Sequence, residues 1–315
     1  MVVNLAASDR RPPAQSPSRG GLRDDLEFLR TLLAKGGPSP CDYPALQEWF
    51  GGVHARTTSG ELSSNDLRAL REGLGEAVSP GSLQGLAIDQ PDGYPGDFEM
   101  IDKIYVRYLS PNPRLMLWDA FFQSQPASKA VRNRKSYFHC LLDNQYALRR
   151  PLRVLKLACG PGRSMFEWLS AHKDADVTFD CIELDPNAIR YAAALNEEFS
   201  SKIAFQQRNA VRFHPQRQYD LIWAAGLFDY FPDRIFQSVL RRLLPAVANE
   251  GELVIGNFST TNPSRGYMEF GGWSLHHRTP SALTSLARCS GAKAATVRVG
   301  AEAEGINLFL HVSAQ

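Results

Sequence analysis

The spacing of apolar residues changes near Pro151. Before this point apolar residues recur every three or four positions, as they do across residues 22–35, and this spacing predicts helices. Ser63 is a typical helix N-cap before a second helical stretch, and residues 97–109 and 115–148 continue the helical pattern. No segment before Pro151 has the pattern of a sheet strand, so we predict an all-helical N-terminal half.

After Pro151 short apolar runs alternate with helical stretches. Strands are predicted at 153–158, 178–184, 202–207, 219–225 and 251–258, and helices near 163–172, 187–199 and 232–248. Such alternation is typical of a parallel sheet with helices on both faces. Two last strands, 295–299 and 306–312, are joined by a link too short for a crossover helix, so we expect them to pair as an antiparallel hairpin at the sheet edge.

These patterns divide the chain into three segments. Residues 1–20 are rich in Pro, Ser and Arg without periodicity, which predicts a disordered tail. Residues 21–150 form a predicted helical domain that serves as a lid or substrate domain, interrupted by the turn-forming stretch 91–96. Residues 151–315 form the predicted α/β domain.

Composition narrows the class of protein. The chain has 315 residues, of which 43% are hydrophobic, and a formal net charge of +2, which favours neither nucleic acid nor a membrane surface as partner. Its five cysteines are scattered without a C-x-x-C pair, so neither a disulfide framework nor a zinc site is predicted. No apolar run has the length of a membrane span. We therefore expect a soluble cytoplasmic protein that needs no metal.

The most specific motif lies where the first predicted strand ends. The run Val-Leu-Lys-Leu-Ala-Cys-Gly-Pro-Gly-Arg ends in the turn Gly160-Pro161-Gly162, and the second strand ends in Glu183. A glycine turn presents backbone N–H groups to a ligand, and a carboxylate at the next strand tip can accept both ribose hydroxyls. Position 165 is Met, so the third glycine of the dinucleotide fingerprint is missing. The pattern predicts a nucleoside cofactor other than a dinucleotide.

The glycine turn, the Ile-Glu-Leu-Asp-Pro run and Asn209-Ala210 together resemble class I S-adenosylmethionine-dependent methyltransferases over roughly residues 130–315. This resemblance implies an α/β, Rossmann-like seven-stranded methyltransferase sheet with the last strand antiparallel, an N-terminal helical lid domain, and S-adenosyl-L-methionine as cofactor. It implies that Glu183 holds the ribose and that Asn209 receives the adenine amino group. The cofactor-binding residues it implies are Arg134, Ala158, Cys159, Gly160, Pro161, Gly162, Glu183, Leu184, Asn209, Ala210, Ala225 and Gly226.

Two residues near this motif have competing interpretations. Asp185 stands before Pro186 at a helix entry, where an N-cap is favoured over a ligand contact. Cys159 is small and lies inside the motif, which favours a buried spacer over a nucleophile.

The segments 93–105 and 132–134 resemble those of bacterial methyltransferases similar to the enzyme that makes hydroxy-fatty-acid methyl esters. The resemblance places Tyr94 or Tyr105 against the sulfonium, where cation–π attraction contributes about 0.5–2 kcal/mol. It places Arg134 near the methionine carboxylate. The alternative is that Gly93-Tyr-Pro-Gly96 is only a tight turn between helices.

Residues for acid–base chemistry are less well defined by pattern. The predicted catalytic residues are Tyr94, Asp97, Asp229, Tyr230 and His276. Asp229 and Tyr230 follow the fourth strand, and the equal alternative is that one caps a helix while the other packs in the core. The long polar loop after Phe258 adds candidates for substrate contact, which are Arg265, Tyr267, Trp273, His276 and His277.

Three functions remain open at this point. The first is methyl transfer to a small molecule of bacterial-type secondary or lipid metabolism. The second is cyclisation of S-adenosylmethionine itself, as in azetidine-2-carboxylate synthases, with release of methylthioadenosine. The third is an inactive S-adenosylmethionine-binding protein. The expected partner is a small-molecule substrate or the cofactor alone, and self-association into a homo-oligomer is left open.

Overall fold

The computed structural model describes residues 20–293 and 296–314, which form two compact units. Within the described residues, unit 1 runs up to Gln90 and adds Tyr108–Gln125 and Ser264–Trp273; the rest of the described chain is unit 2. The tail predicted for 1–20, apart from Gly20, and Ala295 of a predicted strand lie outside the described residues. The chain thus crosses between the units several times, which differs from the single boundary predicted at residue 150.

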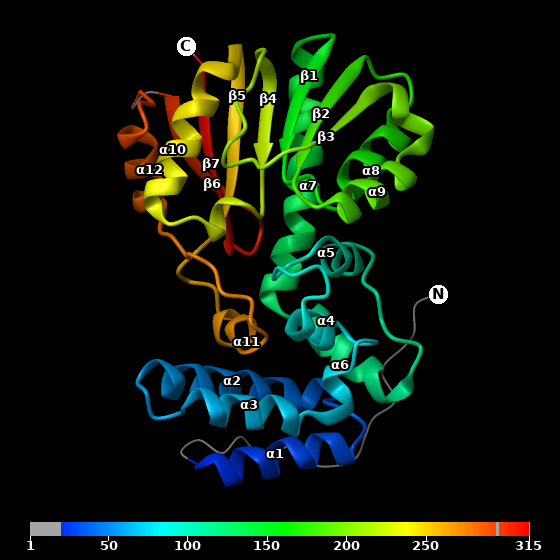
Figure 1. The fold of residues 1–315 in the computed structure, drawn as a ribbon, viewed down its shortest axis with the longest axis vertical. Coiled ribbons are helices and arrows are strands. Elements are labelled where there is room, and N and C mark those ends of the chain that lie inside the picture. The colour runs from blue at the N-terminus through cyan, green and yellow to red at the C-terminus, as the bar shows by residue number, and fades with distance from the viewer. Residues whose placement is uncertain (1–19, 294–295, 315) are drawn as a thin grey trace. The chain divides into compact units, whose positions relative to one another are not determined.

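Unit 1 is helical. Its elements are α1 (Leu22–Ala34), η1 (Pro40–Asp42), α2 (Tyr43–Thr58), α3 (Ser64–Gly73), η2 (Gly75–Val78), α4 (Leu83–Asp89), α6 (Pro113–Ser124) and α11 (Arg265–Phe270) (Figure 1). Ser63 caps α3 as predicted, its hydroxyl accepting the Asp66 N–H. Aromatic side chains from α2, α6 and α11 fill the core, where the Phe50 and Phe270 rings lie 5.1 Å apart. Burial of these rings removes apolar surface from water and stabilises this unit.

The predicted helical segment 115–148 is divided at Gln125 into α6 and α7 (Pro126–Leu148). Gln125 is extended, with φ −59° and ψ 139°. Proline restricts the residue before it to such conformations, so Pro126 ends one helix and begins the next. This break also separates the units, because α6 belongs to unit 1 and α7 to unit 2.

Unit 2 contains a seven-stranded sheet with the order β3-β2-β1-β4-β5-β7-β6. The strands are β1 (Leu152–Leu157), β2 (Val177–Glu183), β3 (Ile203–Gln207), β4 (Tyr219–Ala224), β5 (Val247–Phe258), β6 (Val297–Ala301) and β7 (Asn307–Ser313). Neighbouring strands from β3 to β5 pair in parallel, and β7 is antiparallel to both β5 and β6. The predicted fold class and the terminal hairpin are confirmed.

Helices cover both faces of this sheet (Figure 1). The remaining elements are α5 (Phe98–Tyr105), α8 (Arg163–Ala171), α9 (Pro186–Leu195), η3 (Glu197–Lys202), η4 (Phe228–Tyr230), α10 (Asp233–Leu243), η5 (Leu244–Ala246) and α12 (Pro280–Cys289). Leu155 on β1 packs with α10 and α12, whereas Val154 packs with α7 and α8, because successive strand residues point to opposite faces. Since α7 buries Phe138 against the sheet, it belongs to unit 2 although it precedes the first strand.

Strands β1 and β4 are neighbours in the sheet. The strands that follow β1 in the chain, β2 and β3, lie on one side of this pair, and those that follow β4 lie on the other side. In an open parallel sheet, the carboxyl ends of two such strands border a crevice in which ligands bind.

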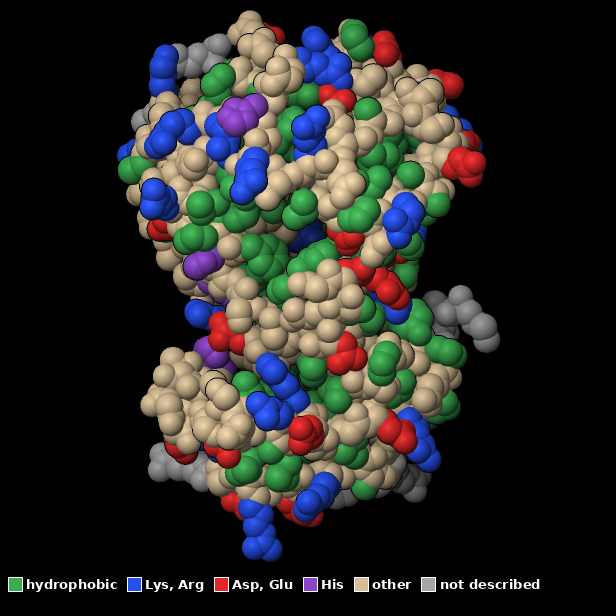
Figure 2. Space-filling model, viewed as in Figure 1, with side chains coloured by type: hydrophobic (Ala, Val, Ile, Leu, Met, Phe, Trp, Pro, Cys, Tyr) green, Lys and Arg blue, Asp and Glu red, His purple; other side chains and the backbone are tan. Residues whose placement is uncertain are grey.

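Among the described helices, none combines the length and apolarity needed to cross a bilayer. Lys and Arg side chains are interspersed with Asp and Glu on the face in Figure 2, in keeping with the small net charge.

Candidate functional site

The turn after β1 brings backbone to the carboxyl edge of the sheet. Ala158, Gly160 and Gly162 all have positive φ, at 48°, 56° and 72°. A Cβ on Gly162 would lie 2.9 Å from the Ala192 Cβ on α9, so close helix packing requires glycine there. A Cβ on Gly160 would meet nothing within 4 Å, so open space lies beside this part of the turn.

Glu183 lies at the carboxyl tip of β2, beside this turn. One carboxylate oxygen accepts the Gly160 N–H at 3.0 Å, and the other accepts the N–H groups of Leu184 and Asp185 at 2.7 and 3.2 Å. These three bonds hold the buried carboxylate in one orientation. Next to it, the Leu184 side chain is 58% exposed, an apolar surface directly beside a fixed acceptor.

Asp185 is the N-cap of α9, as predicted. Its Oδ1 accepts the Asn187 N–H at 2.8 Å, and its Oδ2 accepts the Tyr94 hydroxyl at 3.1 Å. Burial raises the pKa of Tyr94, and the negative charges of Asp185 and Glu183 raise it further. Tyr94 therefore remains a neutral phenol that donates a hydrogen bond to Asp185.

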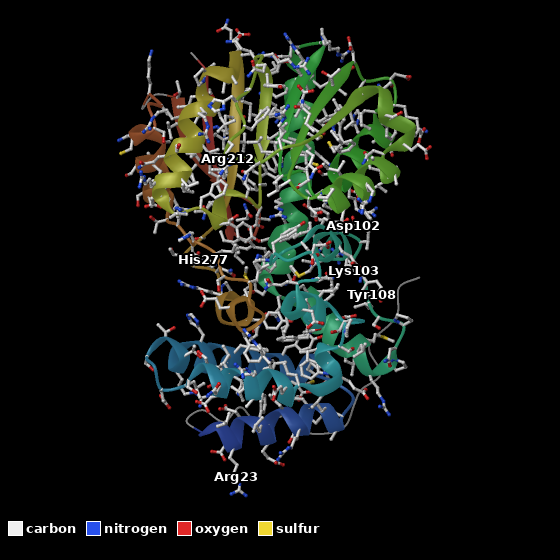
Figure 3. The ribbon with its side chains drawn as sticks, viewed as in Figure 1. Arg23, Asp102, Lys103, Tyr108, Arg212 and His277 are labelled. Atoms are coloured by element: carbon white, nitrogen blue, oxygen red, sulfur yellow. The ribbon has the colours of Figure 1, made fainter. Side chains whose placement is uncertain are left out.

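Tyr94 belongs to a segment, residues 91–105, that we call the strap. Its helix α5 carries Asp102 (Figure 3), whose carboxylate pairs with the Arg163 guanidinium and accepts the Tyr191 hydroxyl at 2.6 Å. At its other end the Tyr230 hydroxyl donates to the Pro95 carbonyl at 2.7 Å. Hydrogen bonds and an ion pair thus join the strap to α8, α9 and η4, the elements that follow β1, β2 and β4.

Arg134 reaches the same edge from α7. Its side chain is buried, with 6% of the residue exposed, and its Nε lies 3.4 Å from the Tyr105 hydroxyl. No carboxylate of the described residues lies within 4 Å of its guanidinium. Gly226, just after β4, has φ +87°, and a Cβ there would lie 2.8 Å from Arg134 Nη1. The guanidinium therefore lies directly against the backbone after β4, and only glycine leaves room for it.

Asp97 and Asp229 are both buried, and each accepts a backbone N–H. Asp97 caps α5 by accepting the Met100 N–H at 2.8 Å, and Asp229 Oδ1 accepts the Phe258 N–H at 2.6 Å. Asp229 Oδ2 is buried without a hydrogen-bond partner among the described residues. Burial raises the pKa of each carboxyl to about 6. Each is held in place by the backbone, which limits its freedom to take a proton from a substrate.

Residues 154–251 match a family model described as a methyltransferase domain. These residues all lie in unit 2 and make up less than half of the chain. None of the curated proteins matches this chain in sequence.

Two solved structures are similar in fold to this chain. One is a protein of Bordetella parapertussis described as a possible exported protein, with TM-score 0.59 and 18% identity over 95% of this chain and 99% of that one. Another is magnesium protoporphyrin IX methyltransferase of Synechocystis with bound SAH, with TM-score 0.51 and 11% identity over 74% and 100% of the chains. At these identities the likeness concerns the fold alone. The family match and the site geometry support S-adenosylmethionine as the cofactor.

The other predicted site residues of unit 2 make fewer contacts that bear on a ligand. Asn209 is exposed, and its Oδ1 accepts the Val211 N–H at 2.8 Å. Cys159 is buried beside Cys181, as expected of a spacer. The His276 side chain is exposed, and it is the backbone N–H of this residue that contacts Asp229, at the carbonyl oxygen. Pro161, Ala210 and Ala225 are buried or half-buried.

The loop after β5 is divided between the units. Arg265, Tyr267 and Trp273 belong to unit 1, where Tyr267 packs among aromatic rings and Arg265 pairs with Glu269 at 2.7 Å. His276 and His277 belong to unit 2. Among residues 20–293 and 296–314, no three His, Cys, Asp or Glu side chains gather as metal ligands would. Substrate contact by these loop residues stays a prediction.

Two features of unit 2 were not predicted. The Asp102–Arg163 pair joins residues 61 positions apart, and no local pattern links them. Lys156 was passed over, although a lysine inside an otherwise apolar strand is itself a signal.

Proposed function

We propose that this protein is an S-adenosylmethionine-dependent methyltransferase that acts on a small molecule. The observation that carries the proposal is Glu183, a buried carboxylate oriented by three backbone N–H groups at the tip of β2. In this role Glu183 accepts the two ribose hydroxyls, and the exposed Leu184 side chain lies under the adenine. Gly160 lies beside Glu183 and leaves open space for the sugar and the sulfur substituents.

Arg134 supports the same assignment at the other end of the cofactor. Burial lowers the pKa of Arg134, and the negative charge of Asp229 raises it without a direct ion pair. A buried guanidinium of this kind can take a further anion as a direct partner. The α-carboxylate of the methionine moiety is such an anion and accepts two parallel hydrogen bonds from arginine. The residues present therefore fit S-adenosylmethionine from ribose to carboxylate.

The acceptor is best assigned as a carboxylate. When bound, S-adenosylmethionine supplies a sulfonium methyl group, which a lone pair of the acceptor takes as the carbon–sulfur bond breaks and the sulfur becomes a neutral thioether. Asp97 and Asp229 each accept a backbone N–H through one oxygen, and the hydroxyls of Tyr94 and Tyr230 donate to Asp185 and to the Pro95 carbonyl. A carboxylate needs no base, because it has already lost its proton at neutral pH. We propose a hydroxy fatty acid or a similar small acid, as the resemblance to methyl ester-forming enzymes implies.

The chain itself then contributes positioning and exclusion of water. The strap is held by Tyr94, Asp102 and Tyr230, and its position over the ends of β1, β2 and β4 shields the methyl group from solvent. Holding two reactants together in a site without water lowers the barrier without a catalytic base.

The test uses the full chain with S-adenosylmethionine, with and without a medium-chain hydroxy fatty acid, and identifies the nucleoside product by mass spectrometry. We expect S-adenosylhomocysteine and the methyl ester only when the acid is present. Methylthioadenosine formed without acceptor would instead establish the cyclase, and tight cofactor binding without turnover on a panel of acids would favour an inactive binding protein.

The cofactor assignment has its own test. Glu183→Gln should weaken S-adenosylhomocysteine binding about tenfold or more, because hydrogen bonds to a charged group contribute about 1.5–3 kcal/mol. Glu198→Gln is the matched control, since Glu198 is exposed and pairs with Lys173. Equal affinity of the two variants would show that the ribose lies elsewhere.

A further inference from the structure

Two buried side-chain oxygens of unit 2 have no hydrogen-bond donor near the carboxyl end of β5. They are Asp229 Oδ2 and Asn307 Oδ1, and neither makes a hydrogen bond with any of the described residues. Only 1% of Asp229 and 0% of Asn307 is exposed, so bulk water does not reach these side chains. Because buried polar atoms in folded proteins are nearly always hydrogen-bonded, this pair calls for a donor from outside the chain.

Both oxygens belong to side chains that flank Phe258, the last residue of β5. Asp229 Oδ1 accepts the Phe258 N–H at 2.6 Å, and Asn307 lies opposite Phe258 in the antiparallel register of β5 and β7. Asn307 Nδ2 donates to the Leu308 carbonyl at 3.1 Å, which fixes the orientation of the amide and leaves Oδ1 as the acceptor without a donor. In each side chain one polar atom is thus held by backbone while an acceptor remains for a ligand.

This pair lies beside the end of β4, at the edge where the proposed cofactor site lies. A Cβ on Gly256 would lie 3.0 Å from the Ala225 Cβ and 3.2 Å from Asn307 Nδ2, so the Asn307 amide is close to the chain just after β4. Asp229 is near enough to Arg134 for their charges to interact. Since the proposed function assigns Arg134 to the methionine end of the cofactor, the two oxygens border the region that a methyl acceptor enters.

A neutral hydroxyl fits these surroundings better than an ammonium group. Burial raises the pKa of Asp229 to about 6, although the positive charges of Arg134 and Arg278 oppose this rise. An ammonium would be a third buried cation near these two guanidiniums, whereas a hydroxyl adds no charge. One hydroxyl satisfies one of the two oxygens, or both through a shared hydrogen bond.

We infer that Asp229 and Asn307 determine the acceptor specificity by accepting a hydrogen bond from a hydroxyl group of the acceptor acid. The inference rests on the proposed function and goes beyond it by naming the residues that recognise the hydroxyl. Neither residue takes a proton or forms a bond in the methyl transfer, since the acceptor carboxylate attacks the methyl group. An acid without a hydroxyl would leave both oxygens buried and without a donor, and a site of this kind rejects such an analogue.

The experiment measures kcat/KM for acids of one chain length, namely the plain fatty acid, the corresponding amino acid, and hydroxy acids with the hydroxyl at successive carbons. The wild-type chain should methylate the best hydroxy acid at least about tenfold more efficiently than the plain acid. Asp229→Asn, which keeps one oxygen for the Phe258 N–H, and Asn307→Leu should each reduce this ratio about fivefold or more. Asp174→Asn and Asn249→Leu are the matched controls, because both residues are exposed.

The outcomes separate this inference from the proposed function. If the wild-type chain methylates none of the acids, the proposed function itself fails. If the plain acid or the amino acid is methylated as well as the best hydroxy acid, the recognition of a hydroxyl is refuted and the proposed function stands. Variants that lower all rates but keep the wild-type ratio would also refute it, because a structural defect affects every acid alike. Should Asn307→Leu not fold, Asp229→Asn and the wild-type ratio still decide.

Discussion

At Gly226, the addition of a single methyl group should weaken cofactor binding while the chain still folds. A Cβ there would lie 2.8 Å from Arg134 Nη1 and 3.3 Å from both Cζ and Nη2. Ordinary contact begins at 3.4 Å, so the guanidinium must move away from the strand end. We therefore expect Gly226→Ala to fold but to bind S-adenosylhomocysteine poorly.

The magnitude follows from two contributions. The backbone of Gly226 has φ +87°, and a left-handed conformation costs an L-residue about 1–2 kcal/mol of folding free energy. Gly60 has φ +79° and nothing within 4 Å of its Cβ position, so Gly60→Ala has the backbone cost alone. Displacing Arg134 from the bound carboxylate costs a further 1.5–3 kcal/mol or so of binding free energy, roughly a 10- to 100-fold loss of affinity.

The assay pairs urea unfolding with calorimetric titration of S-adenosylhomocysteine for wild type, Gly226→Ala and Gly60→Ala. Both variants should lose a similar amount of stability, and only Gly226→Ala should lose affinity. Wild-type affinity in Gly226→Ala would refute the placement of the cofactor carboxylate against Arg134.

Three further predictions concern other parts of the molecule. Asp102→Asn should loosen the strap, because it removes the ion pair with Arg163, and limited proteolysis should cut residues 91–105 about tenfold faster; an unchanged cleavage rate would mean that the pair does not hold the strap. Asp229→Asn should alter the pH dependence of stability. The folded pKa of Asp229, about 6, lies above the ordinary 3.8, so its charge costs stability at pH above 6 and this cost disappears toward pH 4. The variant's advantage in urea unfolding should therefore reach at most about 3 kcal/mol above pH 6 and shrink toward pH 4, and an opposite trend would contradict the burial argument. Phe121→Ala should destabilise unit 1 by about 3–5 kcal/mol in calorimetric unfolding, because the ring is fully buried, and a loss below 1 kcal/mol would show that the core refills.

Much of the sheet could be predicted because its signals are local. Each strand is a short apolar run, and the link before β7 is too short for a helix, so the antiparallel hairpin follows from the sequence. Asp185 as an N-cap follows from its place before Pro186. The division into units could not be found this way, since α7 has a helical pattern like its predecessors and only packing assigns it to the sheet.

The α/β architecture, the glycine turn and the carboxylate at Glu183 can be predicted from the chain's local patterns, because strand period, turn chemistry and motif spacing act over a few residues. The surroundings of these features depend on how the chain packs in three dimensions. Arg134 against Gly226 and Asp102 on Arg163 join positions far apart in the chain. Such contacts depend on how helices pack onto a sheet, and burial determines how strongly their charges interact. Neither packing nor burial can be predicted from a local sequence pattern.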